Sequence, residues 1–150
     1  MSLNQQITED LKNALKQKDN IRVSCLRMLK AAVKNMQVEK RRELNEEEIL
    51  SVISSLIRKG HEAAEEFRKG GREELAKKEE KETGIFYAYM PQQLTETEIE
   101  ETLSEIISEI SAKTLKDLGK VMNEAMARMS GKAQGKEISL IAKKMLTSDK

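Results

Sequence analysis

The chain has 150 residues, enough for one compact domain or two small ones and too few for a larger multidomain enzyme. Its 27 basic and 26 acidic residues leave a formal net charge of +1, so no overall field draws it to nucleic acid or to an anionic membrane. A single cysteine, Cys25, excludes an internal disulfide and a cysteine-based zinc site. The longest stretch without a formal charge, Thr83 to Thr95, has 13 residues, short of the roughly 20 that a membrane span needs. With no apolar export segment at its start, we expect a protein of the reducing cytoplasm that has no membrane partner.

The residue types and their spacing favour an all-α fold. One proline, seven glycines and four aromatic residues, with almost no alternating apolar pattern, argue against a sheet. Apolar residues instead recur at intervals of three and four, which is typical of amphipathic helices.

Four helices are expected before Pro91. The first runs from about Leu3 to Gln17, Asp19 caps the second, and Asn45 followed by three glutamates starts the third. The pair Gly70-Gly71 ends the third helix, and a fourth follows from about Arg72 to Tyr89. The expected inward positions, helix by helix, are Ile7, Leu11 and Leu15; Leu26, Leu29, Val33 and Met36; Ile49, Ile53, Leu56, Ile57 and Phe67; and Leu75, Phe86 and Tyr89. These helices should form an N-terminal helical domain of residues 1–90.

Pro91 marks the expected domain boundary, because proline disfavours helical geometry in the residue before it. Capping boxes that begin at Thr95 and Thr114 predict the starts of two further helices, and a glycine-flanked turn precedes the last one. The expected inward positions are Ile99, Leu103, Ile106 and Ile110; Leu115, Leu118, Met122, Met126 and Met129; and Ile138, Ile141 and Met145. Residues 91–150 should therefore form a three-helix domain, with a hinge at about Met90 to Thr95.

No set of residues predicts a catalytic or cofactor site. His61 is the only histidine and fits an ordinary position on the flank of a helix, and Cys25 is expected to pack as a small hydrophobe. The turn Gly131 to Gly135 lacks the preceding strand that a phosphate-binding loop requires. Gly119 and Gly131 are expected to serve close packing or turn geometry rather than chemistry. We therefore expect no cofactor, no metal ion and no catalytic residues.

Local charge is segregated along the chain. Arg22 to Arg42 holds seven basic residues and one acidic residue, a net +6, whereas Pro91 to Ser111 holds six glutamates and no base, a net −6. Ala112 to Lys150 holds nine basic and four acidic residues, a net +5. Such a segment suits a phosphate backbone, because each neutralised phosphate releases counterions. A solvated helix face also needs lysines, and the methionine stripe fits either a core or an adaptable protein-binding groove.

Three segments together resemble the GatB/YqeY family. They read LRMLKAAVKN at 26–35, EFRKGGREELAKKEEKE at 66–82 continuing into AYMPQQLTETEIE from 88, and LGKVMNEAMARMSGKAQGKEISLIAKKML at 118–146. The resemblance, closest to the stand-alone YqeY proteins, implies an N-terminal helical domain and a C-terminal domain similar to the tail of the GatB subunit of tRNA-dependent amidotransferases. That tail contacts tRNA. The family resemblance points to glutamine-dependent carbon–nitrogen ligases, but the catalytic region that precedes the tail in GatB has no counterpart here. Gln134 stands where the family commonly has an acidic residue, which removes a helix cap.

We therefore expect an accessory module that binds tRNA or another structured RNA without a catalytic site of its own. Six lysines on or beside the last two helices are assigned to the contact and expected to converge on one side: Lys116, Lys120, Lys132, Lys136, Lys143 and Lys144. The alternative is a helical protein-interaction adapter, docking on an amidotransferase or another translation protein. The opposed charged segments and the aromatic cluster Phe86 to Tyr89 favour that alternative. An independent amidase or ligase is the weakest hypothesis for want of residues.

Overall fold

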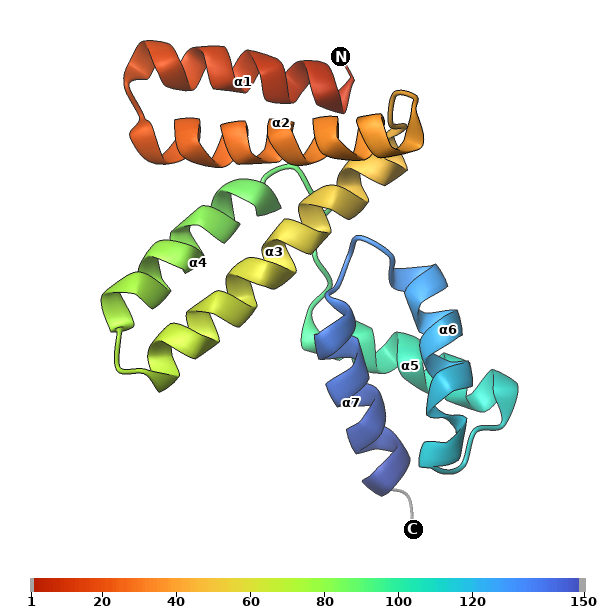
Figure 1. Cartoon of the computed structure of the whole chain (residues 1–150). Helices are drawn as coiled ribbons and strands as arrows, with labels where there is room; N and C mark the ends of the chain where they lie inside the picture. Colours follow the sequence, from red (N-terminus) through yellow and green to blue (C-terminus); the bar gives the residue numbers. More distant parts are fainter. Residues whose placement is uncertain (1, 149–150) are drawn as a thin grey trace. The chain divides into compact units, whose positions relative to one another are not determined.

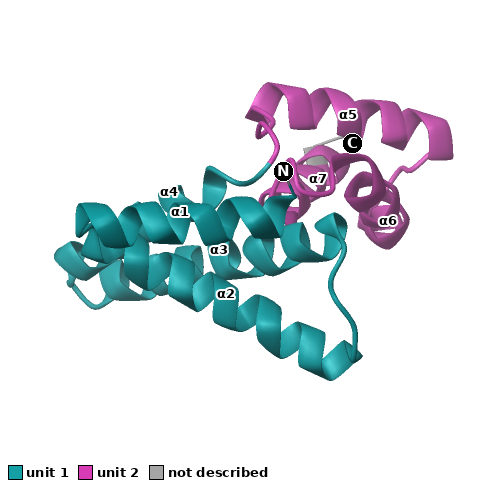
Figure 2. Cartoon of the chain, turned by 90° about the horizontal axis from the view of Figure 1, so that it is seen from above, with its two compact units in different colours: residues 1–90 teal, residues 91–150 magenta. Residues whose placement is uncertain are grey.

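The computed structural model describes residues 2–148, which form seven α-helices and one short 3₁₀ helix and contain no strand (Figure 1). The elements are α1 (Leu3–Gln17), α2 (Asn20–Lys40), α3 (Glu46–Lys69), α4 (Glu73–Tyr87), α5 (Glu96–Ile110), η1 (Leu115–Asp117), α6 (Leu118–Met129) and α7 (Gly135–Ser148). The all-α class is confirmed. The chain divides into two compact units, unit 1 with residues 1–90 and unit 2 with residues 91–150 (Figure 2).

Unit 1 is built from two helical hairpins, α1 with α2 and α3 with α4 (Figure 1). Its core forms where the hairpins meet and comprises Ile7, Ala14, Cys25, Leu26, Leu29, Val33, Leu44, Ile49, Val52, Ile53, Ile57 and Phe86. Ala64 on α3 and Ala76 on α4 are buried outside this core, because the second hairpin continues beyond it. The expected burial of Cys25 as a small hydrophobe is confirmed, since 1% of the residue is exposed.

The inward positions of unit 1 differ from the expected stripes where a small residue competes with a large one. On α1, Ala14 is 1% exposed whereas Leu15 is 47% exposed. On α4, Ala76 and Thr83 are buried whereas Leu75 is 38% exposed. Small side chains let neighbouring helices approach closely, so the contact line follows them rather than the bulkier leucines. The expected positions Leu15 and Leu75 are therefore wrong.

The helix starts follow the expected capping residues. The Asp19 carboxylate accepts a hydrogen bond from the Arg22 amide (3.3 Å), and Asn45 and Thr95 each form a complete capping box with the residue three positions later. Thr114 forms its box as well, but it opens the 3₁₀ helix η1 instead of α6. Each cap satisfies amide groups that a helix start would otherwise leave without partners.

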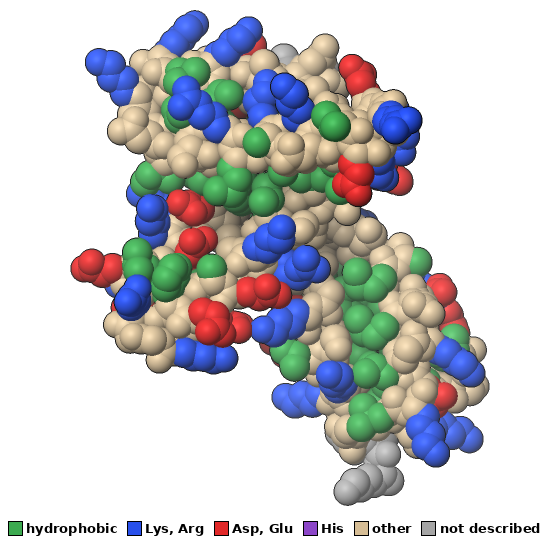
Figure 3. Space-filling view, in the orientation of Figure 1, with side chains coloured by type: hydrophobic (Ala, Val, Ile, Leu, Met, Phe, Trp, Pro, Cys, Tyr) green, Lys and Arg blue, Asp and Glu red, His purple; other side chains and the backbone are tan. Residues whose placement is uncertain are grey.

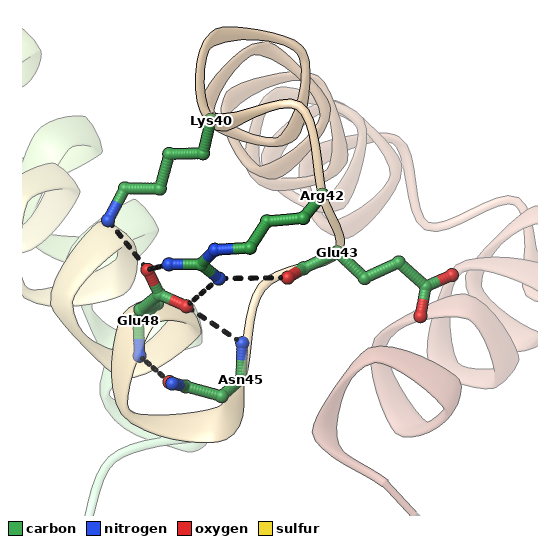
Figure 4. A network of polar contacts seen from close by, with 5 residues as sticks. All are labelled: Lys40, Arg42, Glu43, Asn45 and Glu48. Atoms are coloured by element: carbon green, nitrogen blue, oxygen red, sulfur yellow. Dashed lines mark hydrogen bonds and ion pairs between the residues drawn. The ribbon is translucent and has the colours of Figure 1, made fainter.

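One carboxylate, that of Glu48, links the end of α2 to the start of α3 (Figure 4). Glu48 accepts a hydrogen bond from the Asn45 amide (3.0 Å) and pairs with Lys40 (2.6 Å) and Arg42 (2.7 Å). These hydrogen bonds, Arg42 first, hold the pKa of Glu48 well below its usual range. Arg42 Nη1 also donates to the carbonyl oxygen of Glu43 (3.1 Å). Two of the cations in the basic segment from 22 to 42 are thus occupied by one glutamate.

Unit 2 is a three-helix arrangement of α5, α6 and α7, with η1 leading into α6. Its core comprises Ile99, Leu103, Ile106, Val121, Ala125, Met129, Ala133, Ile138, Ala142 and Leu146. The expected stripe of α6 is wrong at two positions, because Met126 is 41% exposed and Leu115, in η1, is 49% exposed. Ala125 occupies the contact instead of Met126, for the reason given for Ala14. A Cβ at Gly119 would meet nothing within 4 Å, so the close packing expected of this glycine is wrong.

Candidate nucleic-acid interface

The turn between α6 and α7 is fixed by the segment that follows Pro91. The side-chain amide of Gln93 donates to the carbonyl oxygen of Gly131 (2.9 Å), and the amide of Leu94 donates to the carbonyl oxygen of Lys132 (2.8 Å). The Lys132 amide in turn donates to the carbonyl oxygen of Met129 (3.0 Å). Gly131 has φ = +75°, a conformation that glycine adopts without strain, so the expectation of a turn role for Gly131 is confirmed. Two of the segments that carry the family resemblance therefore meet in space, at residues 93–94 and 131–132.

This anchored turn presents two of the six predicted lysines. Lys132 lies in the turn itself, and Lys136 is the second residue of α7; both are exposed. Ala133 between them is 8% exposed, so the turn rests on the core of unit 2 while its lysines face solvent. A backbone held by hydrogen bonds loses little freedom on binding, which favours contact with a ligand.

The other four lysines lie at the opposite end of the α6–α7 hairpin. Lys116 belongs to η1 and Lys120 to the start of α6, and η1 contacts α7. Lys143 and Lys144 lie in the second half of α7, and all four are exposed. The twelve residues of α6 separate the two ends by about 18 Å. The antiparallel hairpin thus places the six lysines in one group of two and one of four along its length, and their convergence on one side stays a prediction.

Carboxylates modify the charge of this unit. Asp117 accepts hydrogen bonds from the amides of Lys113 (2.9 Å) and Thr114 (3.4 Å), and these bonds lower its pKa. Its negative charge therefore stays beside the four-lysine group at neutral pH. Lys150, which the local charge of +5 included, lies outside the described residues.

Arg128 on α6 is engaged with the acidic helix α5. Its guanidinium pairs with Glu109, with Glu105 (3.9 Å) and with Glu124 of its own helix (3.1 Å). The hydrogen bond to Glu109, and after it the one to Glu124, raises the pKa of Arg128. Part of the negative charge of the −6 segment is thus balanced inside unit 2 by a cation of the +5 segment.

The α6–α7 face also exposes apolar side chains (Figure 3). Hydrophobic groups run over both helices in this view. The large hydrophobic residues most exposed on η1, α6 and α7 are Leu115 (49%), Met126 (41%) and Leu140 (59%). Lysines of α7 lie beside Leu140 in the sequence at 136 and 143. This mixture of lysine and apolar surface suits an interface as well as a solvated helix.

Three side chains of unit 1 that could carry chemistry, His61, Cys25 and Tyr89, have defined surroundings in the described structure. Exposed His61 has its Nε2 3.0 Å from the hydroxyl of Tyr87, which is an ordinary contact on the flank of α3. Burial raises the pKa of the Cys25 thiol to about 11. The Tyr89 hydroxyl donates a hydrogen bond to Asp10 (2.5 Å). Burial, together with this bond, raises the pKa of Tyr89. Over residues 2–148 no group of three His, Cys, Asp or Glu could hold a metal ion, and no helix is long and apolar enough to span a membrane.

The fold defines a class of small helical proteins with a two-hairpin unit followed by a three-helix unit. A family model described as "Yqey-like protein" matches residues 4–146, so the chain belongs to the YqeY-like family. The resemblance seen in the sequence is confirmed at this level.

Curated relatives carry the name "Altered inheritance of mitochondria protein 41, mitochondrial". The protein from Lachancea thermotolerans is 31% identical over 69% of this chain and 57% of its own length. Those from Eremothecium gossypii (32% identical, 56% of this chain, 46% of the relative) and Pyrenophora tritici-repentis (26%, 85% and 71%) are also similar. The chain thus spans about half the length of the first two relatives. These relatives are named as mitochondrial proteins, and a cytoplasmic location of this chain stays a prediction.

Proposed function

We propose that this YqeY-like protein is an accessory RNA-binding module whose unit 2 contacts the phosphate backbone of tRNA or another structured RNA. The observation that supports this function most strongly is the anchored turn, where two family motifs meet and present Lys132 and Lys136 to solvent. The four-lysine group at the other end of the hairpin supplies a second set of cations. Binding through phosphates needs no catalytic residue and carries no base code.

The separation of the two lysine groups sets the size of the ligand. Two groups about 18 Å apart on one hairpin cannot both reach a single phosphate group, but they suit a polyanion of that length. A contact through three or four of the six lysines gives a slope of log K against log salt of roughly −2 to −4. Binding should therefore be weak at physiological salt and similar for different tRNA sequences.

The experiment is a salt titration of tRNA binding with the full chain and with Lys132→Ala, Lys136→Ala. We expect the double variant to bind more weakly and to flatten the slope by up to about two units, with helicity unchanged. The control is Lys77→Ala, Lys81→Ala on α4, where both lysines are exposed and the same net charge is lost. Absence of tRNA binding at low salt, or an unaltered slope in the Lys132 and Lys136 variant, would refute the proposal.

A second candidate function, a helical adapter for a translation protein such as an amidotransferase, is favoured by the exposed apolar groups of the α6–α7 face. Leu140 and Met126 are large hydrophobic residues that the core of unit 2 leaves exposed. Isolated apolar residues on a surface are common, whereas a contiguous patch marks interaction sites. Met126→Glu should abolish co-purification of a protein partner under this hypothesis and leave tRNA binding intact. Capture of the same partner by the variant would refute it.

A further inference from the structure

A basic surface in unit 1 lies on the outward side of the α1–α2 hairpin. We call it the α1–α2 basic face, and it comprises Lys12, Lys16, Arg27, Lys30 and Lys34. On α2 the basic positions 27, 30 and 34 share one side of the helix, away from the buried Leu29 and Val33. On α1, positions 12 and 16 lie opposite the buried Ile7 and Ala14. Figure 3 shows basic side chains gathered over these two helices.

One hydrogen bond joins the two halves of this face. Lys30 Nζ donates to the hydroxyl of Thr8 (2.9 Å), so these positions of α2 and α1 are neighbours. Because the two helices run in opposite directions, the next turn of α1 carries Lys12 toward the preceding turn of α2, which carries Arg27. The five cations therefore form one continuous surface.

Few carboxylates offset the positive charge of the α1–α2 basic face. Among the described residues no ion pair involves any of its five cations. The carboxylates nearest in sequence have other partners: Asp10 accepts a hydrogen bond from the Tyr89 hydroxyl, and Asp19 caps α2. Glu9 lies on the outward side of α1 and reduces the charge of the face from +5 to +4. By contrast, the cations at the end of α2 are paired with Glu48 (Figure 4).

We propose that the α1–α2 basic face is a second phosphate-binding surface, which takes the backbone of a structured RNA. Its cations extend about 10 Å along α2, from Arg27 to Lys34, and continue across onto α1. A small anion would engage only part of such an open surface, whereas a polyanion neutralises several of its charges and releases their counterions. The identity of the ligand rests on the proposed function, while the surface itself lies in the other unit.

The composition of the hairpin distinguishes RNA from other polyanionic surfaces. Residues 3–40 contain no aromatic residue, so the hairpin lacks the aromatic anchors of helices that lie in a membrane interface. A specific protein interface needs a contiguous apolar centre. The large apolar residues that this hairpin exposes, Leu15 (47%), Met28 (49%) and Val38 (68%), lie singly on different turns of the two helices, as is common on protein surfaces. RNA needs neither feature, because phosphate contacts are made by exposed cations alone.

The test compares two triple variants of the full chain that lose the same charge. Lys12→Gln, Arg27→Gln, Lys34→Gln removes three cations of the face, while Arg58→Gln, Lys59→Gln, Lys77→Gln removes one arginine and two lysines from the exposed surface of α3 and α4. Glutamine keeps a helix propensity close to that of lysine and arginine. Lys30 is left in place because it bonds to Thr8.

Binding of fluorescein-labelled tRNA is measured at several salt concentrations. The face variant should bind roughly tenfold more weakly at about 0.1 M salt and flatten the slope by about two to three units, while the control changes less than about twofold. An equal loss in both triple variants, or an unchanged face variant, would overturn the proposal. The proposal would also be overturned if the face variant kept its binding to tRNA but lost a binding to vesicles of phosphatidylcholine and phosphatidylserine that the unmodified chain shows. If circular dichroism shows that the triple variant does not fold, the double variant Lys12→Gln, Lys34→Gln repeats the test. It should flatten the slope by up to about two units.

Failure of this inference is distinguishable from failure of the proposed function. If only Lys132→Ala, Lys136→Ala weakens binding, the inference is wrong and the function of unit 2 stands. If only the face variant weakens binding, the inference stands and the assignment to unit 2 is wrong. If both weaken it, both surfaces contribute to RNA binding, and both the inference and the assignment to unit 2 stand. Absence of tRNA binding by the unmodified chain refutes both.

Discussion

At Gly60 the helices α3 and α4 approach closely, and replacing this glycine tests the packing of unit 1. A Cβ at this position would overlap the methyl group of Thr83, while the next atoms, Thr83 Cβ and Glu79 Oε2, lie 3.8 and 3.9 Å away. Thr83 is 4% exposed, and its hydroxyl donates to the carbonyl oxygen of Glu80 (2.8 Å). A methyl group at position 60 therefore has no room while Thr83 keeps its own.

The magnitude follows from two opposing effects. Gly→Ala in an open helix stabilises by about 0.5–1 kcal/mol, and an extra methyl in a packed contact costs about 1–3 kcal/mol. Gly84 on α4, where a Cβ would meet nothing within 4 Å, represents the open case. We expect Gly84→Ala to raise the free energy of unfolding by about 0.5–1 kcal/mol. Gly60→Ala should lower it by up to about 2.5 kcal/mol, the difference of the two effects.

Thr83→Ser completes the cycle, because it removes the overlapping methyl and keeps the hydroxyl. Alone it should cost about 1 kcal/mol for the lost buried methyl. With Gly60→Ala the methyl returns from the other helix, so the two changes should couple favourably by about 1–3 kcal/mol. Urea unfolding followed by circular dichroism measures the four proteins of the cycle and Gly84→Ala. Additive free energies, or equal stabilisation by Gly60→Ala and Gly84→Ala, would refute the packing argument.

Further predictions concern single polar groups. Tyr89→Phe should destabilise by about 1–2 kcal/mol, because a half-buried carboxylate loses its donor, and urea unfolding measures the loss. Gln134→Asp should raise the free energy of unfolding by about 0.5–1.5 kcal/mol in thermal melts, because it supplies the missing cap where the Gln134 carbonyl begins α7. Cys25, with its raised pKa of about 11 and its burial, should react with a thiol reagent at pH 8 only when urea unfolds the chain. Glu48 has a lowered pKa, so its contribution is complete above its ordinary value of 4.5 and is lost as the pH falls; Glu48→Gln should reduce the loss of stability in acid titrations.

Local sequence signals predicted the helix starts well and the buried sides less well. A cap is settled by residues three positions apart, so Asn45 with Glu48 could be identified without any tertiary information. Which side of a helix is buried depends on the partner helix, and the choice of Ala14 over Leu15 follows from close approach to elements distant in the sequence. Left-handed C-caps at non-glycine residues, such as Ser111 with φ = +56°, also leave no local signal.

The lysines of the candidate interface could be predicted, but their grouping could not. Charge and resemblance selected the six residues, and exposure is consistent with that selection. Their division follows from the antiparallel course of α6 and α7. The bond between Gln93 and Gly131 spans 38 positions, a separation at which helical periodicity carries no information. The predicted hinge at Met90 to Thr95 stays a prediction. Because Leu94 is hydrogen-bonded to Lys132, we expect a protease to cut this segment on the N-terminal side of Gln93.

The segment from Tyr89 to Leu94 shows why family resemblance and function must be argued separately. Tyr89 bonds to Asp10 of α1, Gln93 bonds to the carbonyls of Pro91 and Gly131, and Leu94 bonds to Lys132 and packs on the core of unit 2. These groups all have partners within the protein itself, so structural contacts explain the residues of the segment from Tyr89 to Leu94 without any ligand. The residues that distinguish one binding function from another are the exposed cations, which the motif does not explain. Binding by those cations is therefore the property that experiments on this protein must measure first.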